Sequence, residues 1–396
     1  MTYQDENNNT MNKVLECLMN GDGLNRVGEV VQMLMNEAMK VERERYLHVG
    51  HYERSESRTD YANGYKPKEF TTRFGKLSLN IPQVREGNFY PSAFERGARS
   101  EQALKVSMAE MYLQGVSTRK VSKIFEELCG FEVSSTQVSE ATKKLDVTFK
   151  EWRERPLGYF QHLIVDAIYE KVREGGCVTG QAVLIAYGID NEGRRRVLGL
   201  SVSTSEAEIH WRTFLQSLLA RGLCGVETIT SDAHAGLKAA IRAVFPGVQW
   251  QRCQFHLQQN AQAYVPRQSM KADVADKIRQ VFNAPDRLEA DRLLAKVVNE
   301  WSKHAPKLAA WAEEAIPEGL SVMAWDKKKR KKLRTSNLAE RVNKEIRRRT
   351  KVIGIFPNSD ACLRLITAIL QEQDEEWLTA EKRYLLSDEN VPDGTD

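Results

Sequence analysis

Asp166 is a carboxylate inside an apolar segment that is predicted to be a strand. Alternation with period two places it on the same face as Ile164 and Ile168. An ionised carboxylate among apolar neighbours is costly unless a cation or hydrogen-bond donors compensate for it. Asp166 is therefore either a site residue or a buried aspartate paired with a nearby base, Lys171 or Arg173.

Two further acids stand beside predicted helices. Asp232 follows the predicted strand Glu227–Ser231 and precedes a helix, where an aspartate is also an ordinary N-cap. In open α/β sheets, however, ligands bind at the carboxyl ends of strands. Glu340 follows Asn337 by three residues, so it could belong to a helix cap. The spacing leaves both roles open for each acid.

The predicted helix Leu338–Arg349 has two different faces. Helical geometry places one acid among polar and basic residues on one face (Glu340, Asn343, Lys344, Arg347) and apolar residues on the opposite one (Leu338, Val342, Ile346). If the apolar face packs on a sheet, the opposite face is exposed. Glu340 would then stand among cations on the side that a polyanion would meet.

The three acids together suit a two-metal phosphoryl-transfer site. They lie on a first strand, at the end of a later strand and on a downstream helix. Hard oxygen ligands of this kind hold Mg²⁺ or Mn²⁺. Two ions about 3.5–4 Å apart can activate the attacking oxygen and stabilise the leaving one.

A dense basic block surrounds the third acid. The chain has 396 residues and a net charge of +4. Between Lys327 and Lys351 there are thirteen Lys/Arg and two acids, a net charge of +11, so the other 371 residues carry −7. This block predicts a polyanionic partner, and the alternative is a solvated lysine-rich loop. The candidate phosphate contacts are Lys328, Arg330, Lys332, Arg341, Lys344, Arg347 and Arg348.

Composition excludes several other classes. A hydrophobic content of 41% and a charged content of 28% are typical of a globular protein. No apolar run approaches the 18 to 20 residues of a membrane span, and the N-terminus lacks the features of a signal peptide. The six cysteines form no paired-thiol spacing, which predicts reduced thiols and a cytoplasmic protein.

Cys253-x-x-His256 is half of a zinc motif. No second pair is spaced to complete it, so a hydrogen-bonding role near the site or plain packing is favoured over structural zinc. The sequence contains no Gly-rich phosphate loop, G-x-S-x-G or H-E-x-x-H motif.

The central region predicts a mixed sheet of five strands with helices on its faces. The predicted elements are strands His162–Tyr169, Gln181–Ile189 and Arg196–Ser203, helix His210–Leu223, strand Glu227–Ser231, helix Gly236–Val244 and strand Val248–Phe255. Three strands that can pair by hairpins, followed by strand–helix alternation, give the element order of the ribonuclease H-like α/β fold. A long helical segment, Gln258–Met323, follows, and then a final helix pair, Leu338–Arg349 and Asp360–Leu370.

The N-terminal region predicts smaller elements. These are a helical segment, Asn12–Leu47, a β-hairpin around Gly75 that Pro82 ends, and three helices between Ser100 and Phe149. Breaks at Gly115 and Gly130 suit a helix-turn-helix, although many three-helix bundles look the same. The residues predicted to contact DNA here are Arg119, Lys120, Lys123, Ser135 and Gln137.

With these residues in hand, the sequence resembles transposases of mutator-type bacterial insertion sequences. The matching stretches are Asp166–Arg173, Ser231–Ala240, Phe245–Pro246, Trp250–Leu257 with Asn260, and Leu333–Asn358. The resemblance covers nearly the whole chain and shows no departure at the three acids.

The resemblance implies roles for these residues. Asp166, Asp232 and Glu340 would form an Asp-Asp-Glu triad that binds two Mg²⁺ or Mn²⁺ ions, and Cys253 and His256 match the family's C-x-x-H signature. The family binds the terminal inverted repeats of its own element, acts on target DNA and forms oligomers, at least dimers. It is expected in the bacterial cytoplasm, associated with the nucleoid.

The resemblance also implies an activity and a domain order. The expected activity is metal-dependent DNA strand cleavage and strand transfer; the alternatives are a catalytically silent DNA-binding relative and a ribonuclease H-like nuclease that does not join strands. The predicted domains are an N-terminal helical region that could dimerise (1–52), a β-hairpin region (53–98), a helix-turn-helix DNA-binding domain (99–158), the first part of the catalytic core (159–260), an all-α insertion (261–329) and the second part of the core with the basic helix and C-terminal helices (330–396).

Overall fold

A computed structural model describes residues 3–19, 25–50, 55–94, 96, 98–381 and 383–385. The chain divides into two compact units, one up to Lys144 and the other from Leu145. No described helix has both the length and the apolar character needed to cross a membrane. None of the six cysteines is paired in a disulfide in the structure.

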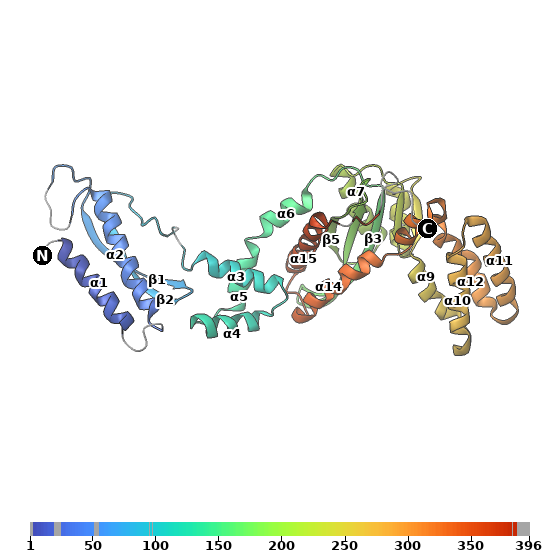
Figure 1. Ribbon diagram of the computed structural model, residues 1–396, viewed down its shortest axis with the longest axis horizontal. Helices are drawn as coiled ribbons and strands as arrows, with labels where there is room; N and C mark the ends of the chain where they lie inside the picture. The colour runs from blue at the N-terminus through green and yellow to red at the C-terminus, as the bar shows by residue number, and fades with distance from the viewer. Residues whose placement is uncertain are drawn as a thin grey trace. The chain divides into compact units, whose positions relative to one another are not determined.

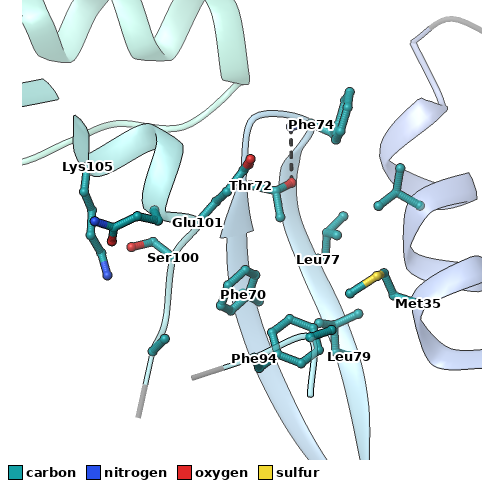
Figure 2. A pocket seen from close by; sticks show the side chains of 14 residues that line it. Met35, Phe70, Thr72, Phe74, Leu77, Leu79, Phe94, Ser100, Glu101 and Lys105 are labelled. Atoms are coloured by element: carbon teal, nitrogen blue, oxygen red, sulfur yellow. Dashed lines mark hydrogen bonds between the residues drawn. The ribbon is translucent and has the colours of Figure 1, made fainter. Parts of the chain in front are cut away.

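The first unit begins with two helices and a hairpin (Figure 1). Its first elements are α1 (Tyr3–Met19), α2 (Val27–Leu47), β1 (Ala62–Thr72) and β2 (Gly75–Val84). Met39 of α2 packs with Phe70 and Leu79 of the hairpin in a shared core. Figure 2 shows an apolar pocket of about 420 Å³ next to this core, and Met35, Phe70 and Phe94 line it.

The segment Asn12–Leu47 is helical where the structure describes it, since it falls on parts of α1 and α2; its residues 20–24 lie outside the described residues. The prediction for the hairpin needs correction. Pro82 does not end the hairpin, because β2 continues to Val84 and Pro82 pairs with Tyr65. Both strands of a two-stranded sheet are edge strands, and a proline is tolerated on an edge.

Three short helices complete the first unit: α3 (Gln102–Leu113), α4 (Thr118–Cys129) and α5 (Ser135–Lys143). Each contacts the other two. Ser117 caps α4, and Gly130 ends it with a positive φ of 70°. Ser134 and Gln137 form the predicted capping box at the start of α5.

The third helix is shorter than predicted. It ends at Lys143, and α6 (Asp146–Glu154) begins in the second unit. The apolar side chains of α5, such as Val138, are buried in the first unit, whereas Asp146 forms an ion pair with Arg364 of the second unit. The predicted helix is therefore divided: α5 packs in the core of the first unit, and α6 belongs to the second unit.

The second unit contains the predicted five-stranded mixed sheet. Its strands are β3 (His162–Glu174), β4 (Cys177–Ile189), β5 (Arg195–Ser203), β6 (Thr228–Ser231) and β7 (Gln249–Arg252). The spatial order is β5-β4-β3-β6-β7. The first three strands pair antiparallel, and β6 runs parallel to both β3 and β7.

Helices cover both faces of this sheet. Leu163 and Val165 of β3 pack with Trp211 of α7 (Glu208–Ala220) and with α8 (Ala235–Val244). The opposite face contacts α14 (Asn337–Ile353) and α15 (Ser359–Thr379), which lie beside β3 and β5 (Figure 1). Alternate residues of β3 thus point into different layers, and the even-numbered ones, including Asp166, face α14.

A helical segment with a core of its own separates β7 from α14. Its helices are α9 (Gln254–Ala261), α10 (Lys271–Phe282), α11 (Arg287–His304), α12 (Pro306–Ala315) and the short α13 (Lys327–Leu333). Leu257, Trp301 and Leu308 belong to this core. The predicted helical character of Gln258–Met323 is confirmed.

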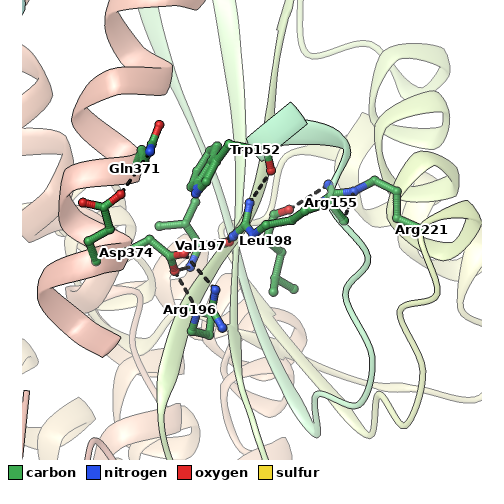
Figure 3. Close-up of polar contacts among 9 residues, drawn as sticks. Trp152, Arg155, Arg196, Val197, Leu198, Arg221, Gln371 and Asp374 are labelled. Atoms are coloured by element: carbon green, nitrogen blue, oxygen red, sulfur yellow. Dashed lines mark hydrogen bonds and ion pairs between the residues drawn. The ribbon is translucent and has the colours of Figure 1, made fainter. Parts of the chain in front are cut away.

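A buried ion-pair network fixes α15 on the sheet (Figure 3). The side chain of Asp374 is 1% exposed. It accepts hydrogen bonds from Arg155 Nη2 at 3.1 Å, from Arg196 Nε at 3.0 Å and from the backbone N–H of Val197 at 2.7 Å. The network joins α15 to β5 and to the chain just after α6.

Candidate active site

Asp166 lies on the face of β3 that contacts α14. Asn343 Nδ2 of this helix donates a hydrogen bond to Asp166 Oδ2 at 2.7 Å. Burial raises the pKa of Asp166 to about 6, although the bond from Asn343 acts in the opposite direction. Lys171 and Arg173 occupy odd-numbered positions and point to the other face. The partner of Asp166 is thus an amide and not one of these bases.

Asp232 directly follows the neighbouring strand, β6, and stands at the same level of the sheet as Asp166. Ile164 of β3 pairs with Thr230 of β6 in parallel register, and each aspartate follows two residues later. Neighbouring strands lie about 4.8 Å apart, and the charge of Asp232 contributes to raising the pKa of Asp166. Asp232 is not the N-cap of α8, because that position belongs to His234.

Glu340 lies in the first turn of α14. The N-cap of this helix is Ser336, not Asn337, so Glu340 is not the acid of the cap considered from the sequence. Glu340 Oε1 is buried and accepts no hydrogen bond from any described residue. His256 Nε2 lies 3.9 Å from this oxygen.

Cys253 and His256 lie between the acids. The backbone N–H of Cys253 donates to Ser231 O at 2.8 Å, directly before Asp232. The Cys253 sulfur lies 3.3 Å from Ser336 Oγ, at the start of α14. This sulfur, and then the charges of Asp232 and Asp166, raise the pKa of His256 to about 9. The motif therefore joins the end of β6 to the helix that carries Glu340.

The residues of this site fit a hard divalent cation in type but are not gathered around one point. Among the described residues, no group of three or more His, Cys, Asp or Glu side chains is close enough to hold an ion. The oxygen donors are nevertheless present, because Glu340 Oε1 and Asn343 Oδ1 are both buried without a hydrogen-bond partner in the described structure.

The basic block forms α13 and the outer face of α14. Most of its predicted contacts with phosphate are exposed: Lys328 and Lys332 on α13, and Arg341, Lys344, Arg347 and Arg348 on α14. Arg348 also pairs with Glu345 at 2.7 Å. Arg330 differs, because its guanidinium donates to the carbonyl oxygens of Trp325 and Pro285.

The predicted DNA contacts of the first unit lie on two of its three short helices. Arg119, Lys120 and Lys123 are exposed on α4, and Ser135 and Gln137 are exposed at the start of α5. Gln137 Oε1 is occupied by the capping box, since it accepts from the Ser134 N–H at 2.8 Å.

Two contacts of the site escaped the sequence reasoning. The helical pattern places Asn343 with the cations that face a polyanion, yet the residue is only 7% exposed and donates a hydrogen bond to Asp166. About two turns further along α14, Thr350 Oγ1 donates to Glu170 Oε1 at 2.9 Å. The only available signal was that Asn343 shares a helix face with Glu340.

Comparison with known sequences identifies the chain's relatives. A sequence profile described as "Transposase, Mutator family" matches residues 2–380. The transposase for insertion sequence element IS406 of Burkholderia multivorans is 56% identical over 92% of this chain and 94% of its own length. The transposase for element ISRM5 of Rhizobium meliloti is 44% identical over 94% of this chain and 92% of its own length.

Comparison with solved structures adds little. A chain from the simian T-cell lymphotropic virus intasome, in complex with PP2A regulatory subunit B56 gamma, covers 49% of this chain and 67% of its own at 10% identity. With a TM-score of 0.18, this match carries no argument about the fold. The sequence relatives decide the matter: the chain belongs to the mutator family of transposases.

Proposed function

We propose that this protein binds the terminal inverted repeats of an insertion sequence and catalyses metal-dependent cleavage and strand transfer of DNA. Asp166, Asp232 and Glu340 are its catalytic acids. The observation that carries the proposal is the parallel register of β3 and β6, which brings Asp166 and Asp232 to one level of the sheet. The hydrogen bond from Asn343 to Asp166 attaches the helix of Glu340 to the same place.

The proposed chemistry has two similar steps. In the first, a water oxygen attacks a phosphodiester at the element end, the bond to the 3′ oxygen breaks, and a 3′-OH is released. In the second, this hydroxyl attacks a phosphodiester of the target and displaces its 3′ oxygen. When bound by the three acids, two Mg²⁺ or Mn²⁺ ions supply activation of the attacking oxygen and stabilisation of the leaving one.

The protein's own side chains contribute binding and orientation. The exposed cations of α13 and α14 lie next to Glu340 in the chain and neutralise phosphates there. Cys253 links the end of β6 to the start of α14, because its N–H donates to Ser231 O and its sulfur contacts Ser336. We assign base reading to α5, with α4 contacting the backbone, in the manner of a helix-turn-helix.

The proposal includes a fold assignment. The strand order and the helices on both faces support a ribonuclease H-like core, interrupted by the helical segment between β7 and α14. We propose that the other domains follow in the order predicted from the sequence. We further propose that the protein acts as a dimer, in the bacterial cytoplasm and associated with the nucleoid.

The test uses end-labelled DNA that carries the repeats flanking the gene, with Mg²⁺ or Mn²⁺ and an unlabelled target. A transposase nicks at the element boundary and joins the new 3′ end to target DNA. Cleavage without joined product would favour a plain nuclease. Selective binding with no cleavage in either metal would favour the silent DNA-binding relative.

A further inference from the structure

Asn343 is a buried amide whose two ends have different surroundings. Its side-chain nitrogen donates to Asp166 Oδ2 at 2.7 Å. Its side-chain oxygen is buried and accepts no hydrogen bond from the residues that the structure describes. An ionised carboxylate can only accept hydrogen bonds, so the amide must present its NH₂ group to Asp166. The side-chain oxygen of Asn343 therefore lacks a hydrogen-bond donor among the described residues, because the NH₂ group is turned toward Asp166.

A second hydrogen bond shows what a purely structural contact between the same elements looks like. Thr350 Oγ1 of α14 donates to Glu170 Oε1 of β3 at 2.9 Å. The two contacts span seven residues of the helix, about 10 Å, and four residues of the strand, about 13 Å. They hold α14 along β3, and Glu340 lies one turn before Asn343. Of these two contacts, only the one through Asn343 leaves a buried oxygen without a partner among the described residues, on the side chain that contacts Asp166.

We propose that Asn343 is a positioning residue for Asp166 and an uncharged oxygen ligand of the cation at this site. Its nitrogen fixes the orientation of Asp166, and its oxygen joins the carboxylates as a donor. The inference rests on the proposed function, because it presupposes a cation bound by the three acids. Amide carbonyls are ordinary ligands of hard divalent ions, and a neutral ligand adds no repulsion to a site that already carries three negative charges.

The choice of residue at position 343 agrees with this double role. A leucine would fill the space against the sheet without leaving a buried polar atom unsatisfied. An aspartate would repel Asp166 in the absence of a cation. An asparagine donates to the carboxylate and still offers an oxygen to a metal.

The experiment measures Mn²⁺ binding to the full-length, DNA-free protein by electron paramagnetic resonance. Asp166→Asn defines the binding that belongs to the acidic site. Asn343→Ala removes both ends of the amide, and Asn343→Asp keeps an oxygen at the same place. Thr350→Val is the matched control, because it removes the other hydrogen bond between α14 and β3 and leaves Asp166 untouched. Tryptophan fluorescence checks that each variant is folded.

The expected result separates the variants. Asn343→Ala weakens Mn²⁺ binding by roughly 10- to 100-fold, the usual cost of losing a group that orients a metal ligand. Asn343→Asp restores most of this affinity, and Thr350→Val stays within about twofold of the wild type.

Several results would overturn the inference. These are wild-type affinity in Asn343→Ala, an Asn343→Asp variant as weak as Asn343→Ala, and equal weakening by Thr350→Val, which would point to helix packing alone. If the wild type binds no more Mn²⁺ than Asp166→Asn does, the metal site of the proposed function fails as well. That outcome is distinguishable, because in the other three the wild type still binds the ion.

Discussion

Replacement of Asp166 by asparagine should abolish catalysis and at the same time make the metal-free protein more stable. The carboxylate is mostly buried among apolar neighbours, where ionisation is costly. Asparagine has nearly the same shape and no charge. The new amide oxygen can still accept the hydrogen bond that Asn343 donates.

The magnitude follows from the pKa. In the folded protein, burial raises the pKa of Asp166 from 3.8 to about 6. Because the folded state then binds the proton more tightly than the unfolded state, the cost of ionisation is fully present above about pH 6 and disappears as the pH falls toward 3.8. The difference corresponds to about 3 kcal/mol at pH 7.5 and about 1 kcal/mol at pH 4.5. These are upper values, since the side chain keeps some contact with solvent.

Urea denaturation followed by tryptophan fluorescence measures this difference directly. All seven tryptophans lie in the second unit, so their emission reports the unfolding of the part that contains the site. Wild type and Asp166→Asn are compared in EDTA at pH 7.5 and at pH 4.5. Addition of Mn²⁺ at pH 7.5 should stabilise the wild type more than the variant.

The reasoning is refuted if Asp166→Asn is no more stable than the wild type at pH 7.5 in EDTA. It is also refuted if the gain is the same at both pH values, because a change in packing alone would not depend on protonation. A gain that is larger at pH 4.5 would reverse the sign of the argument.

Three further predictions concern other parts of the molecule. Asp374→Ala should lower the free energy of unfolding by about 3–5 kcal/mol, because it leaves Arg155 and Arg196 without their shared partner; a loss below about 1 kcal/mol in urea denaturation would contradict this. Replacing Lys328 and Lys332 by glutamine should weaken binding to every DNA and reduce the slope of log affinity against log salt by about 2; a loss confined to the inverted repeats in filter binding would disprove it. Ser135→Ala should lower the preference for element ends over random DNA by about tenfold without removing the cap of α5, which Ser134 provides; equal losses on both DNAs would argue against base reading by this helix.

The order of helices and strands along the chain and the face of Asp166 were predictable because they depend on local patterns. Alternation along His162–Tyr169 fixed which residues of β3 share a face, and the β3–β4 pairing confirms it. Turn residues and capping residues predicted most helix ends to within a few residues of their observed positions, as at Ser117 and Gly130. These signals are carried by neighbours in the chain.

The contacts within the site were not predictable because they join distant residues. Asn343 and Asp166 are 177 positions apart. The sequence around either residue gives no indication that the two side chains are in contact. The same holds for Cys253 and Ser336, whose contact joins the residue that follows β7 to the start of α14. The break between α5 and α6 likewise depends on which core each piece packs against, as the pairing of Asp146 with Arg364 illustrates.

The central claim is that Glu340 is a catalytic acid of a DNA strand-transfer site. Its most direct test compares wild type, Glu340→Gln and Glu345→Gln on end-labelled inverted-repeat DNA with Mg²⁺ or Mn²⁺. Glu345→Gln is the matched control, since Glu345 lies on the same helix but pairs with Arg348 and Arg349. We predict that all three bind the repeats and that only Glu340→Gln fails to nick and join them. Strand transfer by Glu340→Gln at the wild-type rate would contradict the account.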